Sequence, residues 1–84
     1  MVMYKNKTEG GHNNICGRNI KRIREALPEK TSQRKLADQL QMAGLDIDKN
    51  AVQRIESGKR FVTDIELKVI AQVLAVSYET LLDE

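Results

Sequence analysis

Residues 48–60 read DKNAVQRIESGKR. Val52 and Ile55 stand three positions apart, which places both on one side of a helix and makes that side the buried one. Asp48 precedes them as a typical N-cap, because its carboxylate accepts hydrogen bonds from the free N–H groups of a first helical turn. Gly58 follows as a typical helix stop, and we expect it to have a positive φ. The stretch therefore predicts a short helix that begins at Asp48 and ends before Gly58.

The other side of this helix is polar. It carries Lys49, Asn50, Gln53 and Ser57, linked by spacings of three and four, with Arg54 at its edge. Lysine can donate to guanine acceptors, and asparagine and glutamine can pair with adenine through two hydrogen bonds. A solvated helix surface has the same composition, so these residues indicate DNA only within a wider pattern.

The sequence predicts two helices before this one. Apolar residues recur at helical spacing over residues 16–27. Pro28 ends that helix, because proline disfavours the α conformation in the residue before it. Ser32 is a good N-cap for a second helix, which we expect to extend to Ala43 and to stop at Gly44.

Two further helices and an arm complete the chain. Thr63, with Glu66 three residues later, predicts a capping box at the start of a fourth helix, and Ser77 opens a last turn or two. Residues 1–14 are polar and have no apolar periodicity, so we expect a flexible N-terminal arm. Residues 15–84 then form one all-α domain, in which no segment has the pattern of a strand.

Charge is uneven along the 84 residues, although the net charge is only +2. Residues 18–60 hold 11 Lys or Arg against 6 Asp or Glu, whereas residues 61–84 hold one lysine against five acidic residues. A basic middle and an acidic end favour a polyanion as the partner of one face. Chance unevenness of a solvated surface would give the same counts.

Three pieces of sequence, in order, carry a family resemblance: SQRKLA at 32–37, VQRIESGKR at 52–60 and LKVIAQVLAVS at 67–77. Together they resemble the phage-repressor (Cro-like, XRE) helix-turn-helix family over residues 16–82. The resemblance implies a compact five-helix bundle, a lambda-repressor-like DNA-binding domain. It also implies double-stranded DNA as the partner, a homodimer on a palindromic operator, and the helix from Asp48 as the recognition helix.

With the resemblance, the polar helix face becomes a candidate for base readout. In this motif the N-terminal end of the recognition helix meets base edges in the major groove. The expected DNA contacts on this helix are Lys49, Asn50, Gln53 and Arg54. Arg54 could reach a base or a phosphate; the alternative is an ion pair with Glu56 or Asp64.

Contacts to the DNA backbone are expected from other segments. Gln33 opens the second helix, where backbone N–H groups and the helix dipole attract an anion, and the family often has a DNA contact at this place. Lys59 and Arg60 match the family's backbone-contacting loop; a plain solvated turn is the alternative. Glu56 resembles the family's structural acid, which implies bonding within the domain.

The connection after Leu40 is longer than the family's usual one. We expect the second helix to absorb the additional residues by about one more turn. Ile65 and Val69 are apolar where the family often has polar residues. We expect them to cover Met42 or Leu45 within the domain; the alternative is an apolar dimer surface.

The composition argues against an enzyme and against a membrane protein. His12 and Cys16 are the only histidine and cysteine, which excludes a metal cluster of the usual spacing, and no Gly-rich phosphate loop is present. We therefore expect no catalytic residue, metal or cofactor. No apolar run is long enough for a membrane span, and residues 4–7 lack a signal-peptide core, so the expected location is the cytoplasm.

The sequence thus predicts a transcriptional regulator, expected to be a repressor. Two alternatives share the fold. An antitoxin-type regulator would bind a toxin protein as well as its operator. A protein-interaction module would have kept the fold and lost DNA binding, and the basic middle of the chain argues against it.

Overall fold

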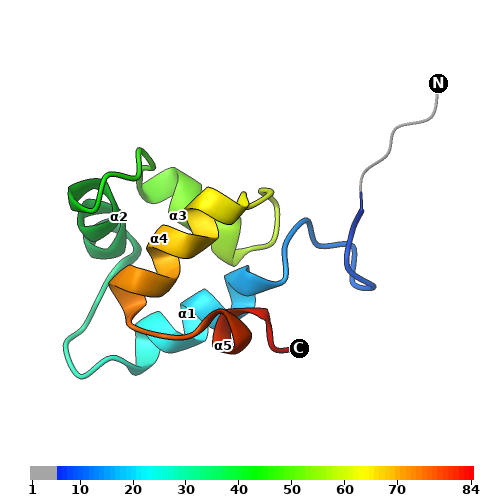
Figure 1. The fold of residues 1–84 in the computed structure, drawn as a ribbon, viewed down its shortest axis with the longest axis horizontal. Coiled ribbons are helices and arrows are strands. Elements are labelled where there is room, and N and C mark those ends of the chain that lie inside the picture. Colours follow the sequence, from blue (N-terminus) through cyan, green and yellow to red (C-terminus); the bar gives the residue numbers. More distant parts are fainter. Residues whose placement is uncertain (1–5) are drawn as a thin grey trace.

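Five helices make up the computed structural model, which describes residues 6–84 (Figure 1). They are α1 (Cys16–Ala26), α2 (Gln33–Met42), α3 (Lys49–Glu56), α4 (Asp64–Leu74) and α5 (Tyr78–Leu82). No strand occurs in the described residues. The structure confirms the predicted all-α, five-helix fold.

Every helix contributes apolar side chains to one core. The largest side chains that are almost fully buried are Ile20, Leu36, Leu40, Val52, Ile55, Ile70 and Leu81. Helix α3 packs against both α1 and α2, α4 packs against α2 and α5, and α5 lies against α1. Because α3 is held from two sides, its outward face has a fixed orientation relative to the rest of the domain.

Side chains cap four of the five helices where the sequence predicts them. Ser32 Oγ accepts the N–H of Lys35 at 3.0 Å, and Asp48 Oδ1 accepts the N–H of Ala51 at 2.8 Å. Thr63 and Glu66 form the expected capping box. Ser77 caps α5 by accepting the N–H of Thr80 at 3.1 Å. Each cap satisfies donors that a helix start leaves unpaired.

The link between α2 and α3, residues 43–48, begins with a Schellman turn. The N–H of Leu45 donates to Leu40 O at 2.9 Å, the N–H of Gly44 donates to Gln41 O at 3.0 Å, and Gly44 has a φ of +95°. The turn directs Leu45 inward, where it is 9% exposed. Ile47, the last residue before the cap of α3, is also buried. The longer second helix is confirmed, with α2 ending at Met42 and Ala43 as its C-cap.

One expectation about this region is wrong. Ile65 does not cover the link, because its side chain is 70% exposed, and Met42 is 89% exposed. The physical reason is that Leu45 reaches the core through its own turn, so its burial does not depend on Ile65. Val69, one turn further along α4, does pack against the core.

Over the described residues, no helix combines the length and the apolar character needed to cross a bilayer.

Candidate nucleic-acid interface

Helix α3 has one buried and one exposed side. Val52 and Ile55 are each 2% exposed and pack into the core, and Ala51 is half-buried beside them. The exposed residues are those of the predicted polar face: Lys49, Asn50, Gln53, Arg54 and Ser57. The apolar side therefore fixes the helix in the core, and the side chains that can form hydrogen bonds with base edges point to solvent.

A buried ion pair holds the C-terminal end of α3. Arg24 of α1 donates from Nε and Nη2 to the two carboxylate oxygens of Glu56, at 2.8 and 2.9 Å. The hydrogen bonds that Arg24 donates to this carboxylate raise the pKa of Arg24. Arg24 Nη1 also donates to Thr31 O at 2.9 Å, so the pair joins α1, the segment before α2 and the end of α3. Glu56 thus bonds within the domain, as the resemblance implies.

Gln33 belongs to the same network. Its Nε2 donates to Glu56 Oε1 at 3.0 Å, and the residue is half-buried as the first residue of α2. The bond brings Gln33 to the end of α3, although the two lie 23 positions apart in the chain. The second N–H of the amide and its oxygen have no protein partner within residues 6–84, which leaves them available to an external group.

The link between α3 and α4, residues 57–63, begins with a second Schellman turn. The N–H of Gly58 donates to Ile55 O at 3.0 Å, and the N–H of Lys59 donates to Arg54 O at 2.9 Å. Gly58 has a φ of +80°, as expected. The side chain of Lys59 is exposed and has no acceptor in the described part of the chain.

Arg60 of the same link is engaged inside the domain. Its Nη1 and Nη2 donate to the carboxylate of Glu66 at 3.1 and 2.8 Å, and Nη1 also donates to Phe61 O at 3.3 Å. Burial opposes the ionisation of Glu66, but hydrogen bonds from Arg60 and from the backbone of Thr63 outweigh it, so the pKa of Glu66 is lowered. The charge of Arg60 is therefore largely balanced by Glu66, whereas that of Lys59 is not.

Arg54 makes neither of the ion pairs that the sequence left open. Glu56 is occupied by Arg24, and no ion pair of Arg54 with Asp64 occurs within residues 6–84. Its exposed side chain at the edge of the α3 face is thus free to reach outward.

A segment before α1 lies against the α3–α4 link, beside it at the right of Figure 1. Thr8 and His12 close a short turn through bonds of 2.9 and 3.0 Å, and the ring of His12 lies over Gly58. Asn13 and Asn14 donate to backbone carbonyls of the link and of the last turn of α3. Of the arm expected over residues 1–14, residues 1–5 lie outside the described residues.

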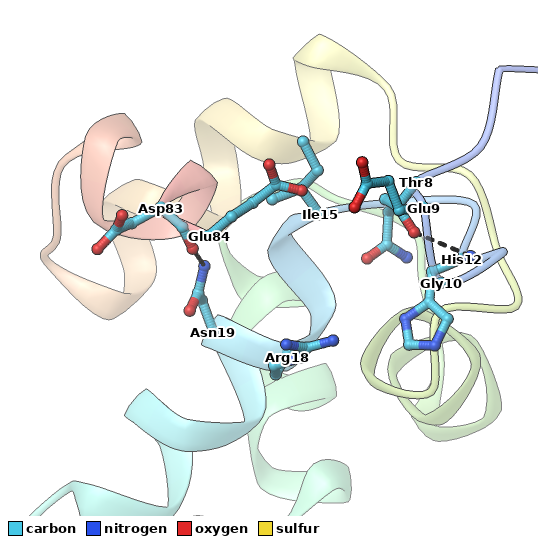
Figure 2. Close-up of a pocket in the computed structure, with 10 residues that line it drawn as sticks. Thr8, Glu9, Gly10, His12, Ile15, Arg18, Asn19, Asp83 and Glu84 are labelled. Atoms are coloured by element: carbon cyan, nitrogen blue, oxygen red, sulfur yellow. Dashed lines mark hydrogen bonds between the residues drawn. The ribbon is translucent and has the colours of Figure 1, made fainter.

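The same segment borders a cavity (Figure 2). On one side lie Thr8, Glu9 and His12; on the other lie Arg18 and Asn19 of α1 together with the last residues of the chain. No group of three or more His, Cys, Asp or Glu among the described residues could hold a metal ion. Cys16 is 2% exposed, and burial raises its pKa to about 11, so it is a protonated core thiol at neutral pH.

All seven residues predicted from sequence thus lie at the start of α2, on α3 or in the link that follows it. Gln33 and Arg60 have internal partners that the sequence did not reveal. Asn13 and Asn14 were missed altogether. A pair of asparagines before a helix is a recognisable cap signal, but their partners in the chain are 41 to 46 positions away.

Comparison with known families agrees with this geometry. The Helix-turn-helix family model matches residues 20–81, which is well over half of the chain. Searches among curated proteins and among solved structures gave no match. The matched residues include α2, the link and α3, with the exposed polar face described above. The chain is therefore a member of the XRE-type (Cro/C1-type) helix-turn-helix family of DNA-binding transcription regulators.

Proposed function

We propose that this protein is a sequence-specific regulator that reads the major groove of double-stranded DNA with α3 and acts as a repressor by occupying its operator. The observation that carries the proposal is the exposed polar face of α3, backed by the buried side chains of Val52 and Ile55. A helix fixed from behind can present its side chains to base edges without being reordered on binding.

Each candidate residue has a role within this proposal. Lys49, Asn50 and Gln53 contact base edges, because their donors and acceptors match those of guanine and adenine. Arg54, at the edge of the face, contacts a base or a neighbouring phosphate. These four residues supply specificity.

Phosphate contacts supply affinity and orientation. Lys59 is the main candidate, because its ammonium group is exposed and has no acceptor in the described residues. Gln33 can donate its second amide N–H to a phosphate while Glu56 holds the first. Arg60 contributes less than Lys59, because Glu66 already balances its charge.

Binding measurements with purified variants test these roles. Gln53→Ala should weaken binding to the selected operator by about 1–3 kcal/mol and relax the preference at one base pair. Lys59→Ala should weaken binding to all duplexes alike and reduce the magnitude of the negative slope of log K against log[salt] by about one. Arg22→Ala removes a positive charge from an exposed site on α1 and is the control, which should leave both properties unchanged. Equal binding of every duplex by Gln53→Ala and the wild type would contradict the recognition face.

We also propose that the protein binds a palindromic operator as a homodimer. An apolar patch of Ile65, Tyr78 and Leu82 lies on α4 and α5, where these side chains are 70%, 49% and 44% exposed. Asp64 and Lys68 border the same patch, one turn apart on α4. In a two-fold interface, Asp64 of one copy can face Lys68 of the other, so the patch is complementary to itself.

Sedimentation of the protein on its operator tests the dimer. Ile65→Asp should prevent dimer formation. Asp64→Lys and Lys68→Asp should each weaken the dimer through like-charge pairs, and the double variant should restore it. A wild-type protein that remains monomeric on its operator would refute this interface. Dimer formation that Ile65→Asp leaves unchanged would also refute it.

A further inference from the structure

Two consecutive asparagines fasten the segment before α1 to the α3–α4 link. The backbone N–H of Asn13 donates to Gly58 O at 2.8 Å, and its Nδ2 donates to Lys59 O at 2.9 Å. Asn14 Nδ2 donates to Arg60 O at 2.7 Å and to Ile55 O at 3.0 Å. Three consecutive carbonyls of the link and one in the last turn of α3 are thus bound from a distant part of the chain. We call this arrangement the asparagine clasp.

The clasp is anchored on α1. Asn14 Oδ1 accepts the N–H of Gly17 at 2.8 Å, which ties the same side chain to the first turn of that helix. At this point α1 and α3 touch through their backbones, since a Cβ on Gly17 would lie 1.9 Å from Ile55 O. The asparagine side chain is therefore held on a rigid base and cannot follow the link if the link moves.

The clasp holds the backbone of Lys59 and leaves its side chain in solvent. The carbonyl of Lys59 faces Asn13, while the exposed ammonium group has no acceptor in the described residues. The neighbouring side chain of Arg60 is held by Glu66. Lys59 therefore carries the one cationic side chain of residues 57–63 that is positioned by its backbone and still available to an anion.

We propose that Asn13 and Asn14 are positioning residues for DNA binding: they hold the α3–α4 link in the geometry in which Lys59 contacts a phosphate. The inference rests on the proposed function. An unclasped link would be free to adopt other backbone conformations, and ordering it again on DNA would oppose binding. Both asparagines lie before residues 20–81, the part that matches the family model, whereas the carbonyls that they bind lie within it.

Salt dependence of binding gives a test that a loss of folding cannot imitate. Asn13→Ala and Asn14→Ala are uncharged substitutions, so neither removes a cation that displaces counterions from DNA. In the full chain, at a temperature where every variant is folded, each should weaken binding to the selected operator by about three- to tenfold. Each should also make the slope of log K against log[salt] less steep, toward that of Lys59→Ala. Adding Lys59→Ala to either variant should reduce the steepness little further.

Asn19 provides a matched control. Its Nδ2 also donates to two carbonyls, those of Leu81 at 2.8 Å and Asp83 at 2.7 Å, but these lie at the C-terminal end of the chain (Figure 2). Asn19→Ala should lower the melting temperature and leave the salt slope unchanged. If Asn14→Ala fails to fold, Asn13→Ala still tests the proposal, because it keeps the hydrogen bond that the N–H of Gly17 donates to Asn14 Oδ1.

The outcomes separate the two proposals. Wild-type salt slopes in both clasp variants, in a protein that binds its operator, would overturn the positioning role and leave the recognition face standing. A wild-type protein that binds no duplex would overturn the proposed function and the positioning role together. A reduced slope in both clasp variants but not in Asn19→Ala would establish the clasp.

Discussion

The two links that flank α3 share a backbone motif and differ in what holds them. Each begins with a Schellman turn and a glycine of positive φ, +95° at Gly44 and +80° at Gly58. The α2–α3 link is held by the apolar side chains of Leu45 and Ile47, which are buried in the core. The α3–α4 link also packs one residue, Val62, against the core, and it is held in addition by polar groups, namely the asparagine clasp and the ion pair of Arg60 with Glu66.

The difference shows how one small domain fixes two links by different interactions. Apolar burial is strong but non-directional, and it suffices where a link only has to connect two helices. Hydrogen bonds are directional, and they fix the backbone at a point where one side chain must face a partner. The α2–α3 link receives one such bond, from Gln41 Nε2 to Ile47 O at 2.8 Å, whereas the link with the candidate phosphate contact is bound at three consecutive carbonyls.

The largest effect is expected where polar groups hold the end of α3 itself. Glu56→Ala leaves Arg24, whose side chain is 11% exposed, without its carboxylate acceptors and with Thr31 O alone. Removing one partner of a buried pair typically costs about 3–5 kcal/mol of stability. Denaturant unfolding should show a loss of that size. Glu29→Ala breaks the exposed pair with Lys35 and should cost less than about 1 kcal/mol. Equal losses in the two variants would contradict this account of α3.

The apolar link has its own most sensitive position. Leu45→Ala should lower the free energy of unfolding by about 2–3 kcal/mol, because it removes buried methyl groups and leaves a cavity. Met42→Ala, at a side chain that is 89% exposed, should change it by less than about 0.5 kcal/mol. If Leu45→Ala lowered the free energy of unfolding no more than Met42→Ala, burial of Leu45 would not be what holds the link.

The two turn glycines allow a direct comparison. Alanine at either position should lower the free energy of unfolding by about 1–2 kcal/mol, because the backbone at both positions is in the left-handed region, which a Cβ disfavours. Gly58→Ala should cost more, since its Cβ would lie 2.8 Å from the ring of His12, whereas nothing lies within 4 Å at Gly44. In a His12→Gly background, which removes both the ring and the Cβ that would lie 3.0 Å away, the excess at Gly58 should disappear. Thermal unfolding of Gly44→Ala and Gly58→Ala, each with and without His12→Gly, measures this excess. An excess that persists without the His12 side chain would contradict a contact of that side chain with the turn.

The smallest expected effect is a pH dependence confined to the polar link. Because the folded state lowers the pKa of Glu66, its interactions stabilise the fold above the ordinary pKa of a glutamate. This contribution is lost as the pH falls through the lowered pKa of the folded state. Glu66→Gln should therefore be less stable than the wild type near neutral pH, by less than about 1 kcal/mol, and the difference should shrink in acid. A difference in stability that does not change with pH would contradict this role.

Local sequence predicted most of the fold and the outward face of α3. The caps at Ser32, Asp48 and Thr63, the stops at Gly44 and Gly58, and the helical spacing of apolar residues all act within a few positions. The α2–α3 link follows the same logic, because its turn glycine and its two buried residues are neighbours in the chain. The sequence left two readings open for Ile65, and its 70% exposure contradicts the preferred one, in which it covers Met42 or Leu45.

The polar link could not be predicted in this way. Asn13 and Asn14 bind carbonyls more than 40 positions away, and backbone carbonyls leave no mark in a sequence. The pair of Arg60 with Glu66 spans six positions, but an exposed arginine beside DNA has the same sequence pattern. The bond from Gln33 to Glu56 depends on how α2 and α3 pack. Contacts between residues that only the packed fold brings together decide which of the candidate cationic side chains is available to DNA.

Selection of bound sequences from a random duplex pool, at near-physiological salt, tests the central claim most directly when the wild type and Asn50→Ala are compared. The account predicts that the wild type enriches a palindromic site, and that Asn50→Ala enriches the same site with the preference relaxed at one base pair of each half-site. No enriched sequence for the wild type, or identical preferences at every position for both proteins, would contradict it.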